Sequence, residues 1–410
     1  MCRKQHHHQP HQHHHHDHTP QPQAVSRRQM LAGLGVTGLL AAGSVPALAS
    51  TSVIKTLEPI APAAAAQVPA LFQIKQVSKS VYAAIARPQA MINCNAAVIV
   101  NADHVLVVDA HSKPSAARAL IGQIRKEITD KPVRYVVNSH FHWDHAQGNL
   151  AYPNAFKNAE IVSSTATREW LAREGAPRLQ QSLEGLPKQI AALRAEADKV
   201  KTQANDKHKR LMTQIAELES YLKEMNPPPI TLPTVTFDQR LVMHRDGKEI
   251  HLLFLGRGHT AGDVVVYLPS EKVVATGDLM HGVLPYMADG YPEEWPRTLK
   301  ALEELDFNRV SPGHGGVQEG KTILANFRGY LEEINEAVAR GVERGDSLAA
   351  LQQAISYDRL RSLQANGNGE RIVRELVAAF DAPSGPESPL KGGVATNIAD
   401  VYNYYVKRRK

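Results

Sequence analysis

The sequence contains very little cysteine. Only two of its 410 residues are cysteine, Cys2 and Cys94. Cys2 lies in an N-terminal segment that we expect to be removed, so the processed chain would keep one thiol and form no disulfide within itself. A lone cysteine is usually a small buried apolar residue, and we interpret Cys94 in this way. A disulfide-stabilised scaffold is therefore excluded.

A strong excess of one charge is also missing. The formal net charge is +6, from 47 basic and 41 acidic residues. Outside residues 1–49 the counts are 43 basic and 40 acidic. No basic stripe is interleaved with aromatic residues, so we expect no nucleic-acid partner. The basic run over residues 407–410 is interpreted as a solvated tail.

Long apolar runs are scarce as well. The run from Ala32 to Ala47 is shorter than the roughly 20 residues that a membrane span needs, and it is rich in Gly and Ala. Arg27 and Arg28 precede it, and small residues lead up to Ala49. The segment resembles a twin-arginine export signal cleaved after Ala49, with a membrane anchor as the alternative. We expect a periplasmic or other extracytoplasmic location, and the twin-arginine export machinery as a partner.

Composition divides the rest of the chain. Residues 1–25 hold nine histidines among Gln and Pro and cannot pack a core, whereas 43% apolar residues overall suffice for one. The expected order is a His-rich arm with the cleaved export signal over residues 1–49, a linker over 50–71, a main domain over 72–316 with a helical insertion over about 180–226, and a helical extension over 317–410.

Hydrophobic periodicity predicts strands that alternate with helices. The expected strands are residues 77–86, 96–100, 105–109, 134–137, 161–163, 235–237, 241–244, 249–254, 263–268, 273–276 and 307–310. The expected helices are residues 116–128 and 165–174, two in the insertion joined around 203–209, and then 322–340, 348–355 and 369–380, with a loop over 382–393. This order predicts an α/β layer fold.

One stretch concentrates metal-ligand chemistry. His140, His142, Asp144 and His145 follow the apolar strand over residues 134–137. Alternate positions of an extended segment share a face, so His140 and His142 can reach one metal ion. Asp144 and His145 come where the chain must turn, which lets them point to a second ion. Neutral imidazole and carboxylate are ligands that Zn²⁺ prefers.

Three later residues can complete such a site. His259 follows the strand over residues 249–254, Asp278 follows 273–276, and His314 follows 307–310. Each is a ligand-type residue on a turn after an apolar strand, which is where layered α/β proteins tend to build sites.

These motifs, in this order, resemble the metallo-β-lactamase superfamily over about residues 72–316. The resemblance implies an αββα sandwich with metals at one edge, here with a helical-hairpin insertion and C-terminal helices. It implies two zinc ions, in whose place iron or manganese would also fit. By the same resemblance His140, His142 and His259 would hold the first ion, Asp144, His145 and His314 the second, Asp278 would bridge them, and Asp109 would orient a ligand imidazole.

The resemblance further implies hydrolysis of a small-molecule substrate. Hydroxide bridging two zinc ions would attack a carbonyl of ester, lactone, thioester or β-lactam type, with Asp144 and Asp278 as catalytic residues. No G-x-S-x-G elbow suggests a serine nucleophile. We expect Trp143, His281 and Tyr286 to contact substrate, with local packing as the alternative for each.

Several alternatives remain at this level. An aspartate at 278 is more typical of glyoxalase II and lactonase relatives than of β-lactam-destroying ones, whereas sulfatase-like members carry a longer, glutamate-bearing ligand set. The chain could instead be a metal-binding or partner-binding protein with little turnover. We expect the insertion to be a surface decoration or a homodimer contact rather than a lid.

Overall fold

The computed structural model describes residues 70–89, 91–201, 206–226, 230–380 and 388–409. The His-rich arm, the export signal and nearly all of the expected linker lie outside these residues, so they stay predictions. Within the described parts of the chain, no helix combines the length and the apolar character that a membrane span requires.

The first sheet has seven strands in sequence order. These are β1 (Phe72–Gln76), β2 (Val81–Ala86), β3 (Ala96–Val100), β4 (Val105–Val108), β5 (Val133–Val137), β6 (Glu160–Ser164) and β7 (Val235–Phe237). β1 to β4 pair antiparallel, and β4 to β7 pair parallel. The expected strand over residues 77–86 was wrong in its first half, because the chain turns at Val77 and Ser78 and only Val81–Ala86 is extended. The strand β1 was not predicted from the sequence.

The second sheet has six strands in the order β13-β12-β11-β10-β9-β8. These are β8 (Arg240–Arg245), β9 (Lys248–Leu253), β10 (Val265–Leu268), β11 (Val273–Gly277), β12 (Arg309–Pro312) and β13 (Gln318–Glu319). β11 and β12 run parallel, and the other neighbours run antiparallel.

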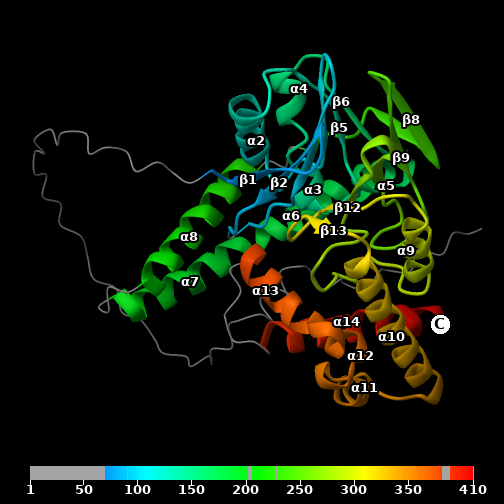
Figure 1. Cartoon of the computed structure of the whole chain (residues 1–410). Coiled ribbons are helices and arrows are strands. Elements are labelled where there is room, and N and C mark those ends of the chain that lie inside the picture. The colour runs from blue at the N-terminus through cyan, green and yellow to red at the C-terminus, as the bar shows by residue number, and fades with distance from the viewer. Residues whose placement is uncertain (1–69, 90, 202–205, 227–229, 381–387, 410) are drawn as a thin grey trace, which may run out of the picture.

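The two sheets pack face to face, with helices on both outer faces (Figure 1). Val108 and Val137 of the first sheet meet Leu252 and Val273 of the second in a shared core. The outer face of the first sheet packs on α2 (Pro114–Glu127) and α4 (Ala151–Ala155). The outer face of the second packs on α9 (Trp295–Glu303) and α10 (Thr322–Arg344). This is the expected αββα sandwich.

The insertion lies between β6 and β7. It contains α5 (Thr165–Trp170), a π-helical turn (Leu171–Gly175), α6 (Ala176–Glu184), α7 (Leu186–Val200) and α8 (Asp206–Glu224). α7 and α8 lie side by side and project from the sandwich (Figure 1). Their apolar stripes bury against each other, with Ile190, Ala197 and Ile215 among the buried residues. The helical hairpin is therefore confirmed. The single helix expected over residues 165–174 changes to a π-turn at Leu171.

The C-terminal part is helical. It contains α11 (Leu348–Ala354), α12 (Arg361–Gln364), α13 (Asn368–Phe380) and α14 (Ser388–Arg409). The loop expected over residues 382–393 was wrong from Ser388 onward, where α14 begins. A Cβ at Gly393 would lie 2.7 Å from Leu284 Cδ1, so this glycine lets the helix pack closely on the domain. The expected basic tail is instead the end of α14, where Arg408 pairs with Glu293.

Candidate metal centre

The candidate site lies at one edge of the sandwich, where strand ends from both sheets meet. In the first sheet, β4 leads to Asp109 and β5 leads to residues 138–145, which include the short helix α3 (Trp143–Ala146). In the second sheet, β11 leads to Asp278 and β12 to His314. Residues that are far apart in the sequence therefore converge at one place.

Two glycines allow the strand ends to approach closely. Gly277 has a φ of +50°, and a Cβ there would lie 2.2 Å from Oγ of Ser139. A Cβ at Gly313 would lie 2.3 Å from Oδ1 of Asp278. The Gly313 amide donates a hydrogen bond to the Gly277 carbonyl at 2.8 Å. A side chain at either position would force the site apart.

One cluster consists of His140, His142, His259 and Asp278, whose ligand atoms all lie within 4.8 Å of one another. Nδ1 of His142 is 3.0 Å from Nε2 of His140 and 2.8 Å from Nε2 of His259. All four side chains are buried. The alternation seen in the sequence therefore places His140 and His142 together.

A second cluster consists of Asp144, His145 and His314. Oδ2 of Asp144 lies 3.1 Å from Nε2 of His314 and 3.5 Å from Nε2 of His145. Asp278 faces both clusters. Its Oδ2 is 3.5 Å from Nε2 of His259, and its Oδ1 is 3.3 Å from Nε2 of His145.

Asp109 lies directly behind the two clusters. Its Oδ1 accepts a hydrogen bond from the Ser139 amide at 2.7 Å. Its Oδ2 accepts from Oγ of Ser139 and from Nδ1 of His145, each at 2.8 Å. Because the Ser139 hydroxyl donates to Asp109, its oxygen is left to accept from Nδ1 of His140, 3.0 Å away. Asp109 thus orients one imidazole directly and another through Ser139.

Asp289 orients the imidazole of His142 in the same way, and this residue was not predicted from the sequence. Nε2 of His142 donates to Oδ2 of Asp289 at 2.9 Å. The same oxygen accepts from Arg178 of α6 at 2.7 Å. Burial disfavours a charged Asp289, but His142 and Arg178 outweigh that and hold the pKa of its carboxyl well below the usual range. Asp289 lies in a loop after β11, and no local sequence pattern marks it.

These hydrogen bonds fix the protons of the imidazoles, because a carboxylate can only accept. Neutral His145 then presents the lone pair of Nε2 toward Asp144 and Asp278, at 3.5 and 3.3 Å. Neutral His142 presents the lone pair of Nδ1 toward Nε2 of His140, 3.0 Å away. Lone pairs and carboxylate oxygens at these distances repel one another unless a proton or a cation lies between them. Burial acts to lower the pKa of His145, but the negative groups around it, Asp278, Asp109 and Asp144 among them, raise it well above its ordinary value, which reports the same demand for positive charge. The donor set therefore fits bound divalent metal ions.

The electrostatics of the two clusters differ. Burial is the main cause that lowers the pKa of His140 well below its ordinary value, which keeps this imidazole neutral and able to bind a cation. Burial acts in the same direction on His314, but the carboxylates of Asp278 and Asp144 together outweigh it and raise the pKa of His314. The second cluster therefore has the stronger demand for positive charge.

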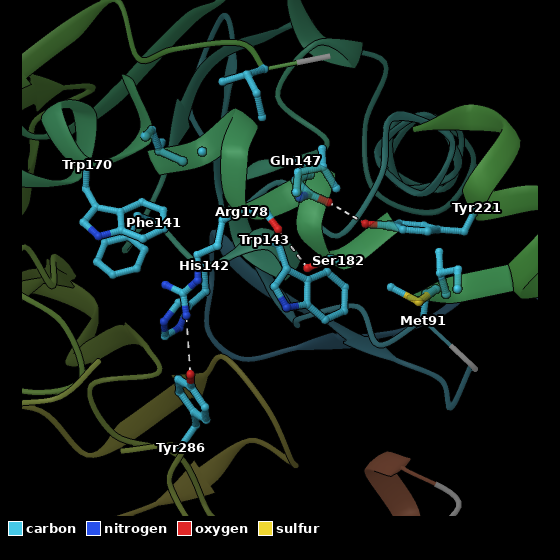
Figure 2. Close-up of a pocket in the computed structure, with 15 residues that line it drawn as sticks. Met91, Phe141, His142, Trp143, Gln147, Trp170, Arg178, Ser182, Tyr221 and Tyr286 are labelled. Carbon is cyan, nitrogen blue, oxygen red and sulfur yellow. Dashed lines mark hydrogen bonds between the residues drawn. The ribbon is translucent and has the colours of Figure 1, made fainter. Parts of the chain in front are cut away.

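A pocket opens beside the first cluster (Figure 2). Trp143 and Tyr286, two of the three expected substrate contacts, line it together with His142. The third, His281, does not line this pocket: its ring is buried beside the second cluster, with its centroid 6.1 Å from that of His314 and 5.3 Å from that of Phe327. Ser182, Leu186 and Tyr221 of the insertion also line the pocket. The expectation that the insertion only decorates the surface is therefore corrected, because it builds one wall beside the site, whereas the dimer contact stays a prediction.

The fold and the donor set define an αββα protein with histidine and aspartate clusters at one edge of the sandwich. Residues 91–314, more than half of the chain, match the metallo-beta-lactamase superfamily. The protein belongs to this superfamily.

Curated relatives cover different chemistries. The chain is 25% identical to the linear primary-alkylsulfatase of Pseudomonas sp. (strain ATCC 19151) over 254 residues, 59% of this chain and 46% of the relative. It is 30% identical to the metallo-beta-lactamase type 2 of Bacillus sp. (strain 170) over 82 residues, 18% of this chain and 32% of the relative. The chain thus spans less than half the length of these relatives. The solved metallo-beta-lactamase from Pontibacter korlensis aligns with 64% of this chain and 99% of its own, at 18% identity and a TM-score of 0.47.

Proposed function

We propose that the protein is a metal-dependent hydrolase that cleaves a carbonyl substrate of the ester, lactone, thioester or β-lactam type. The observation that carries the proposal is the position of Asp278. One of its oxygens lies 3.5 Å from His259 in the first cluster, and the other lies 3.3 Å from His145 in the second. A carboxylate that faces both ligand sets in this way can be shared by two neighbouring metal ions.

The ligand assignment follows the two clusters. Imidazole and carboxylate suit zinc, and iron or manganese accept the same donors. When bound, two such ions supply Lewis acidity and lower the pKa of a water toward about 7. In this proposal the first ion is held by His140, His142 and His259, the second by Asp144, His145 and His314, and Asp278 is shared.

Asp144 is the residue that we assign to proton movement. Its side chain is fully buried, and its Oδ2 is 3.1 Å from Nε2 of His314. A carboxylate in this position can orient an attacking water and accept its proton. Asp278 fixes the separation of the two ligand sets. Asp109 and Asp289 keep the imidazoles of His145 and His142 in the tautomers that face the clusters.

The similarity to an alkylsulfatase gives a second candidate, hydrolysis of a sulfate ester at the same site. The full chain, loaded with zinc, should therefore be tested on a phenyl ester, a lactone, a thioester, a β-lactam and an alkyl sulfate. We expect turnover of at least one carbonyl substrate and close to two equivalents of metal. Turnover of the alkyl sulfate alone would favour the second candidate.

The matched variants are His140→Ala and His244→Ala. His244 lies on β8 with its side chain 73% exposed, and it belongs to neither cluster. His140→Ala should abolish turnover with the fold retained, whereas His244→Ala should behave as the unaltered protein. A chain that binds two metal ions but turns over none of the five substrates would be a metal-binding protein, and the proposal would fail.

A further inference from the structure

The pocket beside the candidate metal centre has a largely aromatic and aliphatic wall (Figure 2). Trp170 and Phe141 stack with ring centroids 3.7 Å apart and planes 8° from parallel. The rings of Trp143 and Tyr221 meet edge to face at 6.5 Å. Leu179 of α6 lines the same space. Stacked aromatic rings are rigid, so this surface is already shaped before any ligand arrives.

The polar groups of the wall are engaged with one another. The Tyr221 hydroxyl donates to Oε1 of Gln147 at 2.7 Å, and the Ser182 hydroxyl donates to the carbonyl of Arg178 at 2.9 Å. The guanidinium of Arg178 donates to Asp289 at 2.7 Å, which neutralises its charge. The pocket therefore offers mainly apolar surface and no uncompensated charge to a ligand.

The pocket is continuous with the metal centre because His142 belongs to both. His142 lines the pocket, and its Nδ1 lies in the first cluster. A molecule held between α6 and the segment Phe141–Trp143 would therefore present one end to the metal ligands. The other end would lie among the aromatic rings and leucines.

We propose that this pocket binds an uncharged alkyl or aryl group of the substrate and so selects apolar substrates for the metal centre. The inference rests on the proposed function, because the reacting bond must lie at the His142 end. Each methylene that enters an apolar pocket tightens binding about fourfold. The affinity of the protein for a substrate should therefore rise with the length of its apolar chain until the pocket is full.

Alkan-2-ones test the pocket without turnover, because they carry a carbonyl but no hydrolysable bond. Binding to the metal-loaded full chain is measured by titration calorimetry. From butan-2-one through hexan-2-one to octan-2-one, affinity should rise about fourfold per added methylene. Hexan-2-one with a terminal hydroxyl should bind at least about tenfold more weakly than hexan-2-one, since its polar end would be buried without a partner. Equal affinities across the series would overturn the proposal.

Two substitutions on α6 provide the matched pair. Ser182 lines the pocket and Gln181 does not, and both positions are exposed, so a phenylalanine is tolerated at either. Ser182→Phe should fill part of the space and weaken octan-2-one binding by about tenfold, the effect of losing nearly two buried methylenes. Gln181→Phe should bind octan-2-one as the unaltered chain does. Unchanged binding by Ser182→Phe would contradict the proposed location.

Failure of this inference can be told apart from failure of the proposed function. Ketone binding that grows with chain length, with no hydrolysis of any ester, lactone, thioester or β-lactam, supports the pocket and rejects the hydrolytic function. If the protein hydrolyses esters but its affinity for the ketones does not depend on chain length, the pocket proposal is rejected and the hydrolytic function is retained.

Discussion

Asp289 accepts a hydrogen bond from Nε2 of His142 at 2.9 Å, across 147 positions of the sequence. Asp109 holds Nδ1 of His145 in the same way at 2.8 Å. One imidazole of each cluster is thus oriented by a carboxylate outside the cluster. Such carboxylates fix the tautomer of a ligand imidazole and strengthen its lone pair.

The first prediction concerns Asp289→Asn. The substitution keeps the size of the side chain but replaces a charged carboxylate, which can only accept, by an amide that can also donate, so the tautomer of His142 is no longer fixed. We expect metal affinity, measured by competition with a chelator, to fall about 10–100-fold. Asp306→Asn is the control, because Asp306 is exposed and pairs only with Lys272 at the surface. Equal metal affinity in the two variants would show that Asp289 does not support the site.

The second prediction concerns Arg178, which joins the insertion to Asp289. Arg178→Gln leaves the Asp289 carboxylate, only 16% exposed, without its cation. We expect the free energy of unfolding in urea to fall by about 1–2 kcal/mol. Arg173→Gln should have almost no effect, because Arg173 is 70% exposed and its ion pair with Glu174 lies at the surface.

A double variant measures the coupling between Arg178 and Asp289. Combined with Asp289→Asn, the Arg178→Gln substitution should cost less stability than the two single effects added together, since both remove the same interaction. Strict additivity of the two effects would mean that Arg178 acts through other contacts.

The sequence predicted which residues gather at the candidate metal centre, because those residues are marked locally. His140, His142, His259, Asp278 and His314 each follow an apolar strand, and strand ends of one sandwich meet at one edge. The structure brings all of them together with Asp144 and His145. Asp109 was predicted from the family resemblance, and it is the residue directly after β4. Their roles as metal ligands stay predictions until metal content is measured.

Contacts between residues far apart in the chain could not be predicted from local sequence patterns. Asp289 lies in a loop with no strand or helix period, and only the folded chain shows that the loop reaches His142. β1 was missed because the strand Phe72–Gln76 is short and lies at the edge of its sheet. α14 was read as a loop near its start because Gly392 and Gly393 are poor helix formers. Close packing of Gly393 on Leu284 overrides that preference.

The third prediction is a dependence of stability on pH caused by Asp400 of α14. This side chain is 8% exposed. Burial is the main cause that raises the pKa of Asp400 from 3.8 to about 7, and the negative charge of Asp289 adds to it. Between these values the unfolded carboxyl has lost its proton while the folded one keeps it. Stability therefore falls as pH rises from about 4 to 7 and levels off above that.

Asp400→Asn removes this dependence of stability on pH. The free energy of unfolding of the variant minus that of the unaltered chain should be about 2–4 kcal/mol larger at pH 8 than at pH 4. The measurement is urea unfolding of both chains at matched pH values, so other titrating groups cancel in the difference. Asp358→Asn, at an exposed position, should show no such trend. A difference between the Asp400 variant and the unaltered chain that does not change with pH would contradict the assignment.

The last prediction separates the two ends of the helical hairpin. The base of the hairpin lines the pocket through Leu186 of α7 and Tyr221 of α8, whereas residues 195–217 of its outer part do not line it. Replacing residues 195–217 by a short Gly-Ser turn would remove only the outer part. It would keep Arg194 and Glu219, which pair across the two helices. We expect metal content and octan-2-one binding to stay unchanged.

The same truncation tests the predicted homodimer. The apolar stripes of α7 and α8 are buried against each other, and Met212, 47% exposed, is the one large apolar side chain left exposed in the described part of the chain. A stable contact between copies normally buries a central apolar patch, and Met212 alone does not supply one. We therefore expect the solution mass, corrected for the deleted residues, to correspond to the same number of subunits before and after truncation. A change from dimer to monomer on truncation, measured by light scattering, would instead establish the outer hairpin as the dimer contact.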